Sequence, residues 1–379
     1  SSEIVLPALA ANRSHLIRGS IYNYVTDYTD MTGFSVAGAA GGKTVGAAAI
    51  MVNVSSRQMT ASVRGEGGRA AIRMPDDEGP FGSGYIYSGT NAVTNVTGEA
   101  YGVGAGSDNG VGGAVAVNAL GDRFISEVVH TDIDTRLRDG AGDVIDGTFG
   151  GVTVENVVQQ SALARAVAGG GGGKVGFGGS AAVNTVDGLL GAFIANSRLR
   201  VATVEALNDQ TVSLDAVGGG VSAGGKAGIG VGVAVNDLST ALLLRLPLAE
   251  IYAQRQIDLN SVQDASIRGF GIAGAVGGKA AISGSVAYNT NTSTNMIDLI
   301  NSTLISGGSV TIRAVNTVDF GSRGGTDEDA QKKTTGTEEE TARGYNIQIA
   351  AGGKVGVGAA VTINTSASTA DVVVRQSSL

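Results

Sequence analysis

The feature that most constrains the fold of this chain is a thirteen-residue segment that recurs along it. Its last copy, residues 352–364, reads GGKVGVGAAVTIN, and five earlier segments end at an equivalent asparagine. Successive asparagines are 65, 66, 52, 53 and 75 residues apart. Self-similarity of this kind is the signature of repeat architectures, so the chain is predicted to be a stack of repeats. The asparagines are Asn53, Asn118, Asn184, Asn236, Asn289 and Asn364.

The composition limits what such repeats can build. Glycine makes up 61 of 379 residues, about twice its usual share, but without the three-residue period of collagen. Apolar content resides in Ala and Val, with no Trp and 4% aromatics, which predicts a narrow interior. A net charge of −8 without a basic stripe argues against nucleic acid as a partner. No apolar stretch is long enough for a transmembrane helix, so no transmembrane segment is expected.

Each repeat contains two alternating runs separated by Gly-Gly-Lys, such as FGIAGAV at 270–276 and VGVGAAVTI at 355–363. Alternation with β-branched residues is typical of half-buried strands, and glycine accepts the positive φ of a turn. The pattern predicts an all-β parallel β-helix whose small strand residues face inward. At about 20–25 residues per coil, a repeat would form two or three coils, giving on the order of 16 coils and a rod approaching ~80 Å. Gly-Gly between alternating runs is also a hairpin signal, so stacked antiparallel β-hairpins are the alternative.

The repeat does not cover the chain evenly. Residues 1–30 do not match it and are interpreted as a boundary or partial-rung segment, with the repeat β-helix at 31–379. Residues 64–90 and the charged stretch 321–344 are predicted to be insertions that loop out of the helix. The chain stops at Leu379, which matches Leu304 within a repeat, so it is interpreted as a fragment of a longer array.

The GGKxGVGxAVxVN segments, followed by N-S-x-L and V-x-I-x-A strings, resemble large exported bacterial adhesins. These are the filamentous haemagglutinin-like and leukotoxin-type filamentous exoproteins, which are secreted by autotransporter or two-partner (type V) routes. The resemblance covers about residues 31–379. It implies a right-handed parallel β-helix, an extracellular location on the bacterial cell surface and a role in attachment, virulence and biofilms. The absence of cysteine fits a secreted protein, although a cytosolic protein can also lack it.

Two repeat positions carry polar residues with more than one interpretation. The lysines of the Gly-Gly-Lys turns are either solvated turn residues or a row of cations that meets anionic glycans or lipopolysaccharide. The asparagines are expected to close strands through left-handed geometry or turn hydrogen bonds, or to stack as a ladder. The lysines are Lys43, Lys174, Lys226, Lys279 and Lys354.

The segment 130–147 concentrates acidic residues. Carboxylate oxygens are the ligands that calcium prefers, so a calcium site is one hypothesis and a solvated loop is the other. A pair of carboxylates for glycoside cleavage is a third. No other cofactor is expected. The calcium candidates are Asp132, Asp134, Asp139 and Asp143.

Two functions of different class follow. The favoured one is not enzymatic: a stalk or binding surface of a secreted adhesin, whose partner is a protein or glycan receptor on host or bacterial cells. Recognition would come from the excursions 64–90 and 321–344, because loops on a rigid scaffold carry binding. The alternative is a β-helical carbohydrate-active enzyme, a polysaccharide lyase or depolymerase. Only two His and no Trp are present to build such a site.

Overall fold

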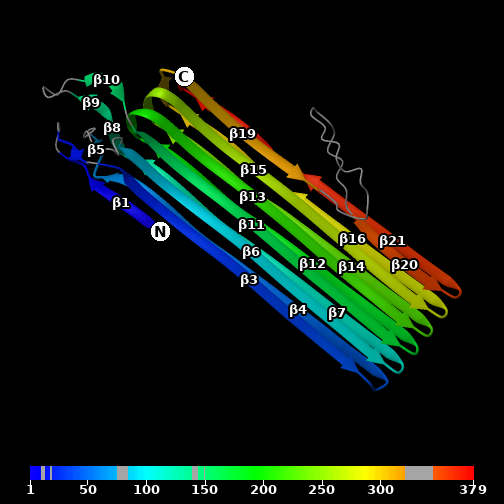
Figure 1. Cartoon of the computed structure of the whole chain (residues 1–379). Helices are drawn as coiled ribbons and strands as arrows, with labels where there is room; N and C mark the ends of the chain where they lie inside the picture. Colours follow the sequence, from blue (N-terminus) through cyan, green and yellow to red (C-terminus); the bar gives the residue numbers. More distant parts are fainter. Residues whose placement is uncertain (10–12, 18, 75–83, 139–143, 149, 321–344) are drawn as a thin grey trace.

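A computed structural model describes residues 1–9, 13–17, 19–74, 84–138, 144–148, 150–320 and 345–379. The described residues form two large parallel sheets that face each other, and they contain no helix (Figure 1). The chain passes from one sheet to the other at each end of the long strands. The fold is therefore a parallel β-helix with two flat walls, as the repeat pattern predicts.

The first wall, sheet A, has nine strands. They are β1 (Ser2–Pro7), β4 (Thr44–Glu66), β7 (Asn109–Val129), β12 (Val175–Ala195), β14 (Ala227–Pro247), β16 (Ala280–Asn291), β17 (Thr294–Ile300), β21 (Val355–Ser366) and β22 (Thr369–Arg375).

The second wall, sheet B, has eleven strands. They are β2 (His15–Leu16), β3 (Ile21–Ala40), β5 (Ala70–Arg73), β6 (Tyr85–Gly106), β8 (Thr131–Asp134), β11 (Gly151–Gly172), β13 (Arg198–Gly224), β15 (Glu250–Gly277), β18 (Thr303–Ser306), β19 (Ser309–Asp319) and β20 (Tyr345–Gly352). A separate antiparallel pair, β9 (Arg136–Arg138) and β10 (Val144–Thr148), leaves the wall after β8.

One repeat makes one coil, which corrects the expected coil length of about 20–25 residues. Asn184 lies opposite Asn118 on one side and Asn236 on the other, so neighbouring strands of sheet A are a full repeat apart in sequence. A strand of 21 residues such as β14 spans roughly 70 Å, whereas each coil adds only about 4.8 Å to the stack. The part of the helix seen here is therefore a broad slab about six coils high, and the expected rod of ~80 Å along the stack is wrong.

The Gly-Gly-Lys turns join the two walls. The strands on either side of one turn, such as β13 and β14, belong to different sheets and do not pair. This arrangement excludes the hairpin alternative for the described repeats. Only the first turn uses positive φ, at Gly41 and Gly42. In later turns glycine is required by close stacking, because a Cβ at Gly225 would overlap the carbonyl oxygen of Gly173 in the coil before.

The two repeats of 65 and 66 residues gain their extra length at the opposite bend, whereas the 75-residue repeat gains it within sheet B, between β19 and β20, which both pair with β15. In the coil of β13, the strand continues past this bend with only a bulge at Ala202. In the coil before it, residues 135–150 separate β8 from β11. The predicted insertion 64–90 is too wide, because β4, β5 and β6 occupy much of it and pair in the walls. Residues 75–83 and the whole of 321–344 lie outside the described residues. The boundary expected at residue 31 falls inside β3.

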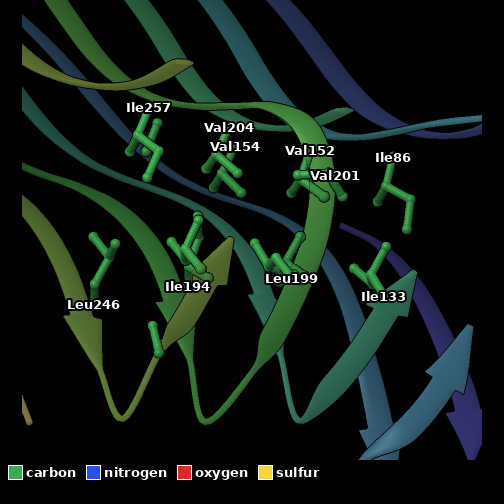
Figure 2. Close-up of a cluster of buried hydrophobic side chains, with 14 of the residues drawn as sticks. Ile86, Ile133, Val152, Val154, Ile194, Leu199, Val201, Val204, Leu246 and Ile257 are labelled. Atoms are coloured by element: carbon green, nitrogen blue, oxygen red, sulfur yellow. The ribbon is translucent and has the colours of Figure 1, made fainter. Parts of the chain in front are cut away.

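The interior tapers from one end of the slab to the other. Near the bend opposite the Gly-Gly-Lys turns, isoleucine, leucine and valine from both walls fill the space between them (Figure 2). Toward the turns the inward residues shrink: β14 presents Leu246, Leu242, Ala234 and then Gly232. At the turn end the walls touch through their backbones, since a Cβ at Gly232 would overlap the carbonyl oxygen of Ile272. The predicted narrow interior and the inward orientation of the strand glycines are confirmed.

The repeat asparagines form a ladder inside the helix. Each lies in the middle of a strand and faces inward, and Asn118, Asn184 and Asn236 are fully buried. The Nδ2 of each donates to the Oδ1 of the next, over 2.7–2.9 Å, from Asn53 through Asn364. The left-handed positions expected for them belong instead to the other bend. These are His130, Asn196, Leu248, Asn301 and Gln376.

The ladder also ties the two walls together. In four coils the second Nδ2 hydrogen donates across the interior to a carbonyl of sheet B, for example from Asn184 to Asp215 at 2.7 Å and from Asn236 to Arg268 at 2.6 Å. The amides of Asn118, Asn184 and Asn236 therefore each pair with an asparagine on either side and with a backbone carbonyl opposite. A buried polar row of this kind is stable only because all of its members are paired.

We expect the substitution Asn184→Ala to lower the free energy of unfolding by about 2–4 kcal/mol, because it leaves the amide of Asn118, the carbonyl of Asn236 and the carbonyl of Asp215 unpaired in the interior. The control is Asn260→Ala, at a half-buried position on the outer face of sheet B, which should change stability by less than about 0.5 kcal/mol. Urea unfolding followed by circular dichroism measures both. Equal losses would contradict the role given to the ladder.

The close approach of the walls is tested by two adjacent glycines of β13. Gly218 faces inward, where a Cβ would overlap the carbonyl oxygen of Val233, whereas a Cβ at Gly219 would make ordinary contact with Val167. Gly218→Ala should cost about 3 kcal/mol or more, and Gly219→Ala should be neutral or slightly stabilising. Thermal melts give the size of each change. Hydrogen exchange should place the damage in β13, β14 and their neighbours, because coils contact only adjacent coils.

Candidate functional site

The acidic residues singled out near 130–147 lie at the bend opposite the Gly-Gly-Lys turns. Asp132 and Asp134 are on β8, which pairs with β5 and β13. Asp134 accepts two hydrogen bonds from Arg136, at 2.8 and 2.6 Å, and Asp132 lies 3.4 Å from Arg200. The hydrogen bond to Asp134 raises the pKa of Arg136 above its usual value. Both carboxylates are therefore paired with guanidinium groups.

The positions of Asp132 and Asp134 do not support the calcium hypothesis, because both carboxylates are paired with arginines. Asp139 and Asp143 lie outside the described residues. Within the described part of the chain, no group of three or more His, Cys, Asp or Glu side chains is arranged to hold a metal ion. A calcium site that includes Asp139 and Asp143 stays a prediction.

The same bend carries a shallow depression of about 260 Å³. Arg136, Arg200 and Tyr252 line it together with the exposed side chain of Ile305. The Arg200 guanidinium lies over the Tyr252 ring, 6.0 Å from its centroid. An aromatic ring beside two guanidinium groups suits a planar or anionic ligand, but both cations are already partly neutralised by Asp132 and Asp134. The depression has no acid–base pair free for catalysis.

The turn lysines are brought together as the sequence predicts. They stack at one edge of the slab, with the backbone N–H of Lys226 donating to Lys174, that of Lys279 to Lys226 and that of Lys354 to Lys279, over 2.8–3.1 Å. All of the lysine side chains are exposed. The coil between Lys43 and Lys174 places Asp108 in the row, and its carboxylate binds the Lys174 Nζ at 2.9 Å. The result is a narrow, mostly cationic edge.

A second interior row was not predicted. Arg57 reaches into the helix, lies over the Phe124 ring, and binds Asp122 and Asp27, each at 2.7 Å. Burial alone would lower the pKa of Arg57, but the hydrogen bonds and charges of Asp122 and Asp27 together outweigh it and the pKa is raised. The hydrogen bond from Arg57 lowers the pKa of Asp27. The Asp122 carboxylate also accepts from Gln160 at 2.9 Å, and the row continues through Gln210, Gln263 and Thr240.

This second row links neighbouring coils through buried side chains. The Asp122 side chain is fully buried, and its two oxygens are held by Arg57 and Gln160. The Asp27 carboxylate at the end of the row is partly exposed, and its Oδ2 accepts from Arg57 and Thr29. Its sequence signal was available, because Gln160, Gln210 and Gln263 recur near the repeat spacing, 50 and 53 residues apart.

On the outer face of sheet B, three acidic side chains lie side by side on neighbouring strands and repel one another. Glu205 lies directly opposite Glu155 in one neighbouring strand and Asp258 in the other. Burial raises the pKa of Glu205, and the two like charges raise it further. The charged form is therefore disfavoured in the folded protein. This contribution lowers stability as pH rises through the raised pKa, and it vanishes below the unfolded value, where both states are protonated.

Replacing Glu205 by Gln should therefore stabilise the protein near neutral pH by about 0.2–0.5 kcal/mol, because solvent screens this exposed carboxylate, and should give no gain at about pH 4. The matched control is Glu99→Gln on the same face, because Glu99 lies 3.4 Å from Arg165 and has a favourable partner. Urea unfolding at the two pH values measures the difference. A gain at pH 4 equal to that at neutral pH would show that charge repulsion is not its cause.

No protein-family model, curated protein or solved structure matches this chain. Among the described residues, there is no helix of the length and apolarity needed to cross a membrane.

Proposed function

We propose that this chain is a rigid scaffold and binding surface of a secreted bacterial adhesin at the cell surface. The observation that carries the proposal is the unbroken asparagine ladder, which binds every coil to the next and both walls to each other. The polar side chains of the described interior hold neighbouring coils in register, and they do not converge on a reactive centre. Such an interior suits a protein whose task is to hold its shape.

The coil geometry favours a broad surface over a long spacer. Each coil uses 52 or more residues to advance the stack by about 4.8 Å, which is an inefficient way to gain length. It is an efficient way to build two wide, flat walls and a long edge. The role that fits best is therefore presentation of contact surfaces to a partner, with stiffness as the accompanying property.

The lysine edge is the surface proposed to meet that partner. Lys226, Lys279 and Lys354 are exposed neighbours in adjacent coils, and none of them has an ion-pair partner among the described residues. A row of ammonium groups repeating at about 4.8 Å suits a linear polyanion better than a single small anion. The ligand class is an anionic glycan on a host or bacterial cell.

The test uses the purified chain on beads added to cultured epithelial cells, with heparin as competitor and as a direct ligand in titrations. The double substitution Lys226→Glu and Lys279→Glu should weaken heparin binding about tenfold or more and release the beads. The control, Arg255→Glu with Arg313→Glu, makes the same change of charge at exposed positions away from the edge and should leave both readouts unchanged.

Two results would overturn the proposal. One is a chain that binds neither cells nor heparin. The other is release of reducing ends or unsaturated sugars when the chain is incubated with uronate polysaccharides, which would establish the lyase or depolymerase alternative.

A further inference from the structure

The outer face of sheet A is divided at the asparagine ladder. Between the Gly-Gly-Lys turns and the ladder, none of its outward side chains is charged. We call this region the apolar face: the outward residues of 44–52, 109–117, 175–183, 227–235, 280–288 and 355–363. Apart from Thr44 and Asn109 beside the turns and Tyr288 beside the ladder, its members are glycine, alanine, valine, isoleucine or phenylalanine.

The taper of the interior forces this arrangement. In this half of the helix the inward positions of the middle coils are glycine, alanine or serine, and larger inward residues occur only in the end coils, at Val45, Met51 and Thr362. The β-branched residues that favour extended strands must therefore point outward. Ile50 is 66% exposed, Val357 51% and Ile282 48%. Beyond the ladder the outward positions of the same strands become charged, as at Asp187 and Asp237.

The apolar face is larger than soluble monomers usually expose. Five outward positions at about 6.6 Å and six strands at about 4.8 Å cover roughly 900 Å². The largest apolar patch of a typical monomer is about 300–600 Å², whereas a stable interface needs about 800 Å² from each partner. Its neutrality matters as well, because two chains of net charge −8 can approach through it without facing like charges.

The relief of the face repeats with the coils. A column of mostly small residues lies between columns of branched and aromatic ones, so ridges and a groove run along the stack. Two copies carry the same column spacing and can interdigitate over the whole face. The small column is Ala48, Gly113, Gly179, Val231, Gly284 and Ala359.

We propose that a second copy of this chain packs face to face on the apolar face, about a two-fold axis, as two sheets of a sandwich do. A lipid bilayer suits the face less well. Edge-first insertion would carry the turn lysines into hydrocarbon, at about 2.5–3.5 kcal/mol for each one. This inference concerns the wall of sheet A and does not rest on the proposed binding at the lysine edge.

The experiment measures the mass of the chain in solution by sedimentation equilibrium between about 1 and 100 μM. The unmodified chain should dimerise, and Val233→Lys should raise the dissociation constant about 100-fold or more, because it sets charges against each other in a desolvated face. Ser239→Lys, outward on the same strand beyond the ladder, should leave the dimer intact. Val221→Lys tests the exposed apolar positions of sheet B and should also leave it intact.

A second variant guards against a folding defect. Val183→Lys is outward on β12 beside the strand that carries Val233, and it should dissociate the dimer with circular dichroism and melting unchanged. The proposal fails if the unmodified chain stays monomeric to 100 μM, or if both variants of the apolar face remain dimers. It also fails if Val221→Lys alone dissociates the dimer. Co-sedimentation of a monomer with phosphatidylglycerol vesicles that Val233→Lys abolishes would assign the face to lipid instead.

Discussion

Everything in this structure depends on parallel pairing in which each residue lies on its counterpart from the next repeat. Because parallel strands are offset by one repeat, a side chain lies beside the equivalent side chain of the next coil. Its contribution to stability therefore depends on how well that residue type interacts with itself. Asparagine on asparagine is favourable, because each amide is both donor and acceptor. Glutamate on glutamate is unfavourable, as the raised pKa of Glu205 shows. Lysine on lysine is tolerated only where solvent surrounds the side chains.

The same pairing makes the interior narrow toward the turn end in one coil after another. Because the strands of the middle coils change from large inward residues to glycine or alanine toward the turns, the two walls converge at the turn end. Convergence leaves no room for inward side chains, and the strand-forming valines and isoleucines move to the outside. An exposed apolar face is thus a direct consequence of how the interior narrows.

The function that we propose for this molecule places binding on its surfaces and edges. The asparagine ladder and the row from Arg57 to Thr240 use polar side chains of the described interior to pair neighbouring coils. At the bend, the carboxylates of Asp132 and Asp134 form ion pairs with Arg200 and Arg136, respectively. What the described residues offer to a partner is a row of cations at one edge and flat walls beside it, which suits recognition of extended ligands and other copies of the chain.

The sequence alone determined the repeat and the alignment of the lysines, because both follow from periodicity. It favoured parallel stacking with inward glycines but left stacked hairpins open. It did not determine how many residues make one coil. Alternation specifies which face a residue takes but not where a strand bends, so strands of about 21 residues could not be told from pairs of shorter ones. It also left the role of the asparagines open, because their amides can serve a turn or a ladder equally well. Only the tertiary structure decided between these roles, because the pairing partners of Asn184 are 52 and 66 residues away and its third partner lies on the opposite wall.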